Sequence, residues 1–166
     1  MNIENISAVY ARDDSIKIDE GYSGKIQFGL LIQSQYNGNH CVEVDGIGSY
    51  LTRSTGTIED IINRGLNSRP ELSNLTCIFS PNGVPDSNDP LNPAKQGSYG
   101  HGAGYILKAG AYPQITDSLT IGAFNPAIGT ANYGIRIDDV HTVPGFLSGF
   151  SKVATSIFAA EFDDPD

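Results

Sequence analysis

The amino-acid sequence predicts a mainly β protein, an antiparallel β-sandwich or β-barrel with one or two short helices. The first observation is a series of short apolar runs bounded by Gly, Pro and Asn, as expected for strands joined by turns. The second is that strand-like and helix-like segments do not alternate regularly, which disfavours a parallel sheet of β-α-β units. The third is the length of 166 residues, which suits one β-rich domain spanning residues 1–166.

The first strands are expected in the N-terminal third of the chain. Residues 1–22 are polar with short apolar alternations, which predicts either a first strand or an extended N-terminal arm. The segment 25–33 begins with alternating polar and apolar residues and ends as a continuous apolar run, so it is interpreted as a partly buried strand. Asn37-Gly38 is a turn signal, and residues 40–44 are therefore expected to pair with 25–33 as a hairpin.

One segment, residues 57–66, has a clear helical pattern. Thr57 is a suitable N-cap, and Asp60 stands three residues later as in a capping box. Gly65 offers the left-handed conformation with which many helices end. The apolar stripe of this helix is formed by Ile58, Ile61, Ile62 and Leu66.

Further strands are expected at 75–79, 104–108, 118–124 and 133–137, where short apolar runs recur. The tail from 145 to 162 fits both a helical and a strand pattern, and its length and the pair Ala159-Ala160 favour a helix.

Residues 80–102 have almost no periodic apolar pattern and predict a long irregular loop. Loops of this length inside a domain are uncommon, and they usually bind something or become ordered against a partner. The residues of this loop that we consider as candidate partner or ligand contacts are Pro81, Asn82, Asp86, Asn88, Asp89, Asn92, Tyr99 and His101.

The charge composition excludes some partners. Nineteen acidic residues against ten basic ones give a net charge of −9, and the basic residues are scattered. Binding to nucleic acid or to an anionic membrane requires a positive surface, so neither partner is expected. Charged residues make up only 17% of the chain, against about 25% in ordinary domains. This indicates either a weakly charged exterior or a surface that is covered by other subunits.

The N-terminus lacks the basic and apolar regions of a secretory signal, so synthesis in the cytoplasm is expected. With only two cysteines and no signal, reduced thiols in the core are preferred for Cys41 and Cys77 over a disulfide, although the sequence does not decide whether they pair.

No segment carries a complete motif for catalysis, metal or cofactor. Residues 97–104 are rich in glycine but match neither the dinucleotide fingerprint nor a phosphate-binding loop, and a close approach of two backbones is preferred over an anion loop around His101. The histidines lack the spacing of zinc ligands, and residues 86–90 depart from the calcium-loop pattern. Asp138 and Asp139 beside His141 suggest a turn after a strand rather than an acid–base group. No catalytic residue, metal or cofactor is therefore predicted.

Three classes of function remain in order of preference. The first is a non-enzymatic structural or assembly protein, with a virion component as its most specific form: a capsid-decorating (cement) or tail-associated protein. It would bind copies of itself and a capsid or tail protein through its loops and N-terminal arm, as a homo-oligomer. The second is a β-sandwich module that binds carbohydrate or another ligand. The third is an enzyme that uses His101 or His141 with a carboxylate.

Overall fold

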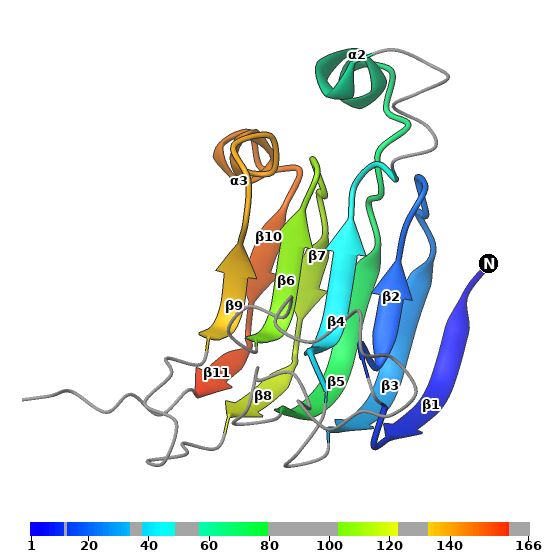
Figure 1. The fold of residues 1–166 in the computed structure, drawn as a ribbon, viewed down its shortest axis with the longest axis vertical. Helices are drawn as coiled ribbons and strands as arrows, with labels where there is room; N and C mark the ends of the chain where they lie inside the picture. Colours follow the sequence, from blue (N-terminus) through cyan, green and yellow to red (C-terminus); the bar gives the residue numbers. More distant parts are fainter. Residues whose placement is uncertain (12, 34–37, 49–56, 80–102, 123–132, 160–166) are drawn as a thin grey trace, which may run out of the picture.

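The computed structural model describes residues 1–11, 13–33, 38–48, 57–79, 103–122 and 133–159. Its strands form two sheets (Figure 1). Sheet A contains β1 (Ile3–Val9), β3 (Lys25–Ile32), β5 (Glu71–Phe79), β7 (Gln114–Thr116), β8 (Leu119–Gly122), β10 (Lys152–Ala154) and β11 (Ile157–Ala159). Sheet B contains β2 (Ile16–Ile18), β4 (His40–Asp45), β6 (Ala103–Lys108) and β9 (Tyr133–Ile137).

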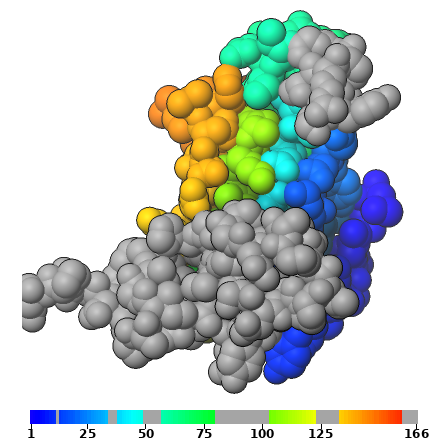
Figure 2. Space-filling model, viewed as in Figure 1, coloured from blue at the N-terminus to red at the C-terminus, as the bar shows by residue number. Residues whose placement is uncertain are grey.

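The chain winds as a parallel β-solenoid. On each turn it passes from one sheet to the other, and each strand pairs in parallel with a strand of the preceding turn in its own sheet. Within sheet A, β7 and β8 follow one another on one turn, and β10 and β11 do so on the next. Figure 1 shows the strands of sheet B running upward in front of sheet A, whose strands run downward. In the space-filling view the colours pass from blue through green to orange across the molecule, so that successive turns lie side by side (Figure 2).

The predicted antiparallel arrangement is therefore wrong, although the β content and the two short helices agree with the expectation. The error has a physical reason. Parallel strands need a long crossover, which is usually a helix, but here a strand of the opposite sheet serves as the crossover. The hairpin expected between residues 25–33 and 40–44 is wrong for the same reason, since β3 pairs with β1 and β5 whereas β4 pairs with β2 and β6.

The turns of the solenoid have unequal lengths. Residues in register in sheet A are separated along the chain by 23, 46, 43 and 38 residues, these residues being Ile3, Ile26, Leu72, Ile115 and Val153. The helix α2 (Ile58–Asn63) lengthens the second of these turns and α3 (Val143–Leu147) the fourth. Because the turns differ in length, the sequence shows no fixed repeat.

A column of left-handed residues bends sheet A along its whole width. One such residue occurs on each turn, directly after positions that are in register, and their φ angles lie between 48° and 59°. The column is Asn5, Phe28, Asn74, Asp117 and Thr155. The bend also shifts the alternation of inward and outward side chains. In β5, for example, Leu72 points inward before the bend and Leu75, Cys77 and Phe79 point inward after it.

The core lies between the two sheets. Leu31 of sheet A and Leu107 of sheet B are fully buried in it. A disulfide joins Cys41 of β4 to Cys77 of β5 across this core, with the Cα atoms 6.0 Å apart. The preferred interpretation of two reduced thiols is therefore wrong, because the winding of the chain brings the two cysteines together from adjacent strands of opposite sheets.

The helices lie at one end of the strands, beyond the carboxyl ends of sheet B (Figure 1). The prediction for residues 57–66 is confirmed, because Thr57 Oγ1 accepts a hydrogen bond of 3.2 Å from the amide of Asp60, and Gly65 has a φ of +69°. The helix expected for 145–162 is wrong beyond Leu147, since β10 and β11 follow and extend sheet A. Among the described residues, no helix is long and apolar enough to cross a bilayer.

Candidate functional sites

Most of the site residues considered from the sequence lie outside the described residues. This applies to all eight loop candidates, from Pro81 to His101. At the end of the glycine-rich segment, Gly104 is described, and a Cβ atom there would lie 2.2 Å from Thr120 Cγ2 and 2.6 Å from the carbonyl oxygen of Gly134. At this one position the close approach of two strands agrees with the preferred interpretation of the glycines.

The group around His141 forms a turn. One carboxylate oxygen of Asp139 accepts hydrogen bonds from the amides of His141 and Thr142, and the other accepts one from Thr142 Oγ1. His141 Nδ1 lies 3.2 Å from Glu59 Oε1, and this contact links α2 to the start of α3 near the surface. The carboxylate that faces His141 is therefore Glu59, which the sequence reasoning did not consider.

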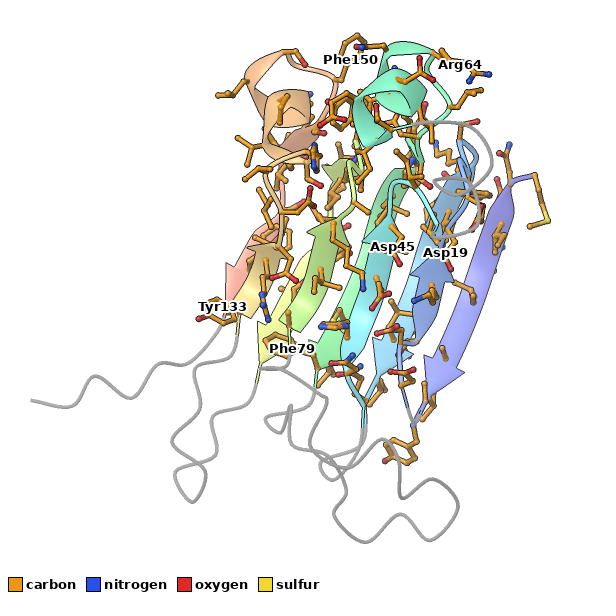
Figure 3. The ribbon with its side chains drawn as sticks, turned by 45° about the horizontal axis from the view of Figure 1, so that its top comes forward. Asp19, Asp45, Arg64, Phe79, Tyr133 and Phe150 are labelled. Atoms are coloured by element: carbon orange, nitrogen blue, oxygen red, sulfur yellow. A yellow bond between two sulfur atoms is a disulfide. The ribbon has the colours of Figure 1, made fainter. Side chains whose placement is uncertain are left out.

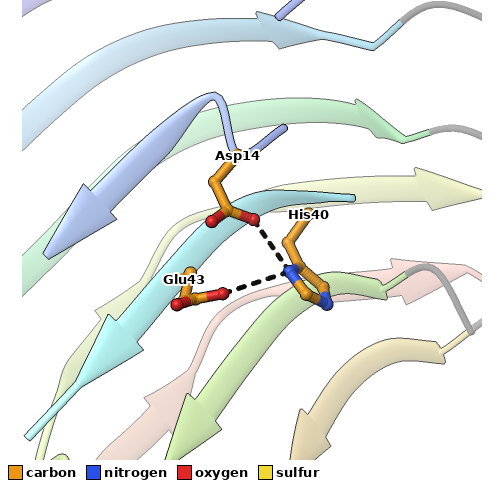
Figure 4. A group of neighbouring side chains, drawn as sticks. All are labelled: Asp14, His40 and Glu43. Atoms are coloured by element: carbon orange, nitrogen blue, oxygen red, sulfur yellow. Dashed lines mark hydrogen bonds and ion pairs between the residues drawn. The ribbon is translucent and has the colours of Figure 1, made fainter. Parts of the chain in front are cut away.

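A buried ionic cluster lies on the outer side of sheet B (Figure 4). His40 Nδ1 is 2.8 Å from Asp14 Oδ1 and 3.6 Å from Glu43 Oε2, and all three side chains are about 5% exposed or less. We call Asp14, Lys17, Asp19, His40, Glu43, Asp45 and Lys108 the sheet B cluster. No local sequence pattern indicates this cluster, because its members are spread over three turns of the solenoid.

An irregularity in β4 makes the cluster possible. Residues three positions apart on a regular strand point to opposite faces, so His40 and Glu43 would be separated. Here Cys41 and Val42 are both fully buried in the core, and the alternation is broken between them. Local insertions of this kind redirect side chains in the manner of a β-bulge.

Glu43 is the centre of charge compensation in the cluster. Its Oε1 atom accepts from Lys17 Nζ and lies 3.0 Å from Lys108 Nζ. Burial would raise the pKa of Glu43, but the hydrogen bonds from His40, Lys17 and Lys108 hold it well below its ordinary value. Burial alone would lower the pKa of His40, but its hydrogen bonds to Asp14 and Glu43 outweigh this effect and raise it.

Two further carboxyl groups share a site on neighbouring strands. Asp19, directly after β2, and Asp45, at the end of β4, lie side by side in Figure 3, and Asp45 is 16% exposed. Burial and a hydrogen bond with Asp19 raise the pKa of Asp45 to about 7. One proton held between two carboxylates reduces their repulsion.

The ligand atoms of Asp14, His40 and Glu43 all lie within 4.8 Å of one another, which is a geometry that a metal ion could use. However, the ammonium groups of Lys17 and Lys108 already contact Glu43. A divalent cation would be repelled by both ammonium groups and would have to displace them from the carboxylate. The cluster is therefore best explained as an internally balanced ionic network that fastens successive turns of sheet B to one another.

The outer side of sheet A beyond the bend is apolar, in contrast to the ionic cluster of sheet B. Two rows of outward side chains run across the turns in register. The first row is Ser7, Leu30, Thr76, Leu119 and Ile157, and the second is Val9, Ile32, Ile78, Ile121 and Ala159. We call these ten residues the apolar face. Seven of them are Val, Leu or Ile and none is charged.

These side chains are in contact with water. Leu30, Ile78 and Ile121 are each about 40% exposed, and Ile157 is 64% exposed. No protein-family model, curated protein or solved structure matches this chain. The function must therefore be argued from the geometry. Parallel sheets are normally covered on both faces, so an open aliphatic face indicates that something else covers it.

Proposed function

We propose that the protein is a structural assembly subunit that associates with other copies of itself through the apolar face. The observation that carries this proposal is the pair of outward rows on sheet A, in register and without a charge. Burial of apolar surface contributes roughly 25 cal/mol per Å², and an open aliphatic sheet gains this free energy only when it is covered. Absence of charge at the centre of a contact is also typical of protein interfaces.

The regular rows of the apolar face suit packing against a sheet of the same kind. Side chains of two sheets interdigitate when the sheets stack about 10 Å apart, and rows of aliphatic residues supply regular ridges for this packing. A second copy of the chain offers the same rows, so a two-fold interface would be self-complementary.

The net charge also favours this face as the contact between copies. A charge of −9 makes two copies repel one another over most of their surface. Contact at the uncharged face keeps the carboxylates of both copies away from the interface and in water. The association is thus expected to be specific in orientation.

The narrower hypothesis of a virion component is kept as part of the proposal, since such a component is a self-associating subunit. It adds one requirement, which is that the oligomer attaches to a capsid or tail protein. Copurification of the protein with intact particles, and its loss from them when the apolar face is disrupted, would support this narrower form.

The test is the mass of the protein in solution, measured by light scattering and sedimentation over a range of concentrations. We expect a defined oligomer for the wild type and a monomer for Ile78→Lys, because a lysine at the centre of the face must lose its hydration on assembly. The matched control is Leu147→Lys on α3, where the side chain is 83% exposed and lies outside the face.

Circular dichroism first establishes that both variants are folded. A monomeric wild type at all concentrations would overturn the proposal, and so would an oligomer that Ile78→Lys leaves intact. Equal loss of the oligomer in Leu147→Lys would place the contact elsewhere on the molecule.

A further inference from the structure

A pocket of about 500 Å³ lies between the two helical segments, and the apolar face is not part of it. It is lined by the end of α2, by Pro144 of α3 and the residues that follow this helix, and by Arg69 and Tyr112. Figure 3 shows Phe150 and Arg64 on the two sides of this end of the molecule. The pocket thus combines aromatic rings with two arginines in a strongly acidic protein.

Arg69 is fixed in one orientation within this pocket. Its Nε atom donates a 2.9 Å hydrogen bond to Asn67 Oδ1, and Nη2 donates one of 3.3 Å to the carbonyl oxygen of Ile62. The guanidinium lies 4.9 Å from the ring centre of Phe150 and 5.5 Å from that of Tyr112. The two rings are stacked, 6.2 Å apart with an angle of 12° between their planes.

The charge of Arg69 has no anionic partner in the described part of the chain. The side chain is half-buried, and both of its polar contacts are to neutral oxygens. Charges that are withdrawn from water are normally paired, because the loss of hydration is otherwise uncompensated. A guanidinium held rigidly with donors still free is suited to bind a carboxylate or phosphate.

We propose that this pocket binds a small organic anion that carries a carboxylate on a flat apolar ring. The carboxylate pairs with Arg69, and the ring packs against Phe150, which is 55% exposed and so keeps an open surface. The chemical class is that of an aromatic or cyclic carboxylic acid. This site is separate from the proposed assembly interface, and it does not depend on the oligomeric state.

The other polar groups around the pocket agree with an anionic ligand. The carbonyl oxygens of Ile62, in the last turn of α2, and of Pro144, in the first turn of α3, already accept hydrogen bonds within the chain. They therefore offer little to a cation. Among the described residues, the ion pair of Arg64 on the rim is a weak surface contact to Asp60, with both side chains 53% exposed, so Arg64 adds positive potential.

The experiment is a titration of the whole protein, followed by amide chemical shifts and calorimetry at constant ionic strength. The probes are benzoate, its neutral analogue benzamide, and inorganic phosphate. We expect benzoate to saturate the site with a Kd on the order of millimolar, since so small a ligand makes few contacts. Benzamide is expected to bind roughly tenfold or more weakly, because it cannot pair with the guanidinium.

Three variants locate the binding. Arg69→Gln is expected to weaken benzoate roughly tenfold or more, whereas Arg64→Gln, with the same change of charge on the rim, should alter it by about twofold. Phe150→Leu removes the ring at an exposed position where folding is retained, and it should also weaken benzoate. If Arg69→Gln does not fold, the proposal is tested by Phe150→Leu and by the comparison of benzoate with benzamide.

Several results would overturn the proposal. Absence of saturable benzoate binding would do so, as would equal binding of benzoate and benzamide. An equal loss in Arg64→Gln and Arg69→Gln would show a general effect of charge in place of a site. Binding of phosphate without benzoate would refute a pocket for a ring-bearing anion.

Discussion

The outward positions of the two sheets are occupied by side chains of different kinds. Neither sheet has a layer of helices over it among the described residues, yet the side chains of the sheet B cluster are largely withdrawn from water whereas those of the apolar face are exposed. On sheet B the outward groups include the carboxylates, two lysines and histidine of the sheet B cluster, which compensate one another. On sheet A beyond the bend the outward groups are aliphatic and uncharged, and they have no partner within the described part of the chain.

The difference shows that the outward residues of a solenoid turn can vary in chemical character. Backbone pairing holds the turns together on both faces, so the winding of the chain does not dictate which residues occupy the outward positions. They can be filled by groups that satisfy one another, which makes the face self-sufficient. They can also be filled by groups that are satisfied only by another molecule, which makes the face an interface.

The largest expected effect is the removal of the central carboxylate of the sheet B cluster. Glu43→Gln removes the nearest carboxylate that Lys17 and Lys108 share, and leaves them only the longer contacts of 3.6 and 3.7 Å with Asp45. Breaking a buried ion pair from one side costs about 3–5 kcal/mol, and we expect a loss near the lower end because both lysines keep some contact with water. The measurement is the free energy of unfolding from urea titration.

The matched control for this variant is Asp138→Asn, which breaks the ion pair with Arg136 near the surface. Pairs of that kind contribute about 0–1 kcal/mol. If the two variants lose the same stability, the sheet B cluster is not the compensated network described above.

The second prediction compares two adjacent leucines of β3. Leu31 is fully buried in the core, whereas Leu30 is 41% exposed on the apolar face. Leu31→Ala should lower the unfolding free energy by about 3 kcal/mol, because it leaves a cavity. Leu30→Ala should cost less than about 1 kcal/mol in the isolated subunit, yet it should weaken self-association.

Unfolding at low protein concentration, together with sedimentation, separates these two effects. The substitution is chemically identical in both variants, so only the direction of the side chain differs. A large loss of subunit stability in Leu30→Ala would mean that the apolar face is packed within the chain and is not open to a partner.

The contrast between these leucines also shows which features of the fold could be predicted from the sequence. The run Leu30-Leu31-Ile32 looks like a strand buried on both sides, but only its middle residue points into the core. Strand positions were predictable because apolar runs and turn residues are local signals. The parallel pairing of the strands was not predictable, because a crossover made by a strand of the other sheet leaves no local signal in the sequence.

The candidate sites were less predictable from the sequence than the fold. His40 and Glu43 share a face only because the alternation of β4 breaks at Cys41 and Val42, and nothing in the sequence marks that break. The pocket at Arg69 depends on α3, which lies on a different turn of the solenoid. The capped helix after Thr57 was predictable, because capping involves residues close together in the sequence.

The last prediction concerns pH, and it applies to the sheet B cluster alone. The pKa of Asp45 is raised from 3.8 to about 7, so the folded protein keeps this proton in a range where the unfolded chain has lost it. The contribution of Asp45 to stability is therefore fully present below about pH 4 and is lost as the pH rises through about 7. The lowered pKa of Glu43 acts in the opposite direction, since its contribution is lost as the pH falls below its ordinary value of 4.5.

Asp45→Asn isolates the first of these effects, because the amide does not titrate while Glu43 remains in place. The free energy of unfolding of the variant, relative to the wild type, should increase as the pH rises from 4 to 7 and should be constant above that range. Urea titrations at a series of pH values measure this difference. Leu30→Ala on the apolar face should show a constant difference from the wild type throughout. A constant difference for Asp45→Asn as well would show that Asp19 and Asp45 share no proton, and that the two faces do not differ in their response to pH.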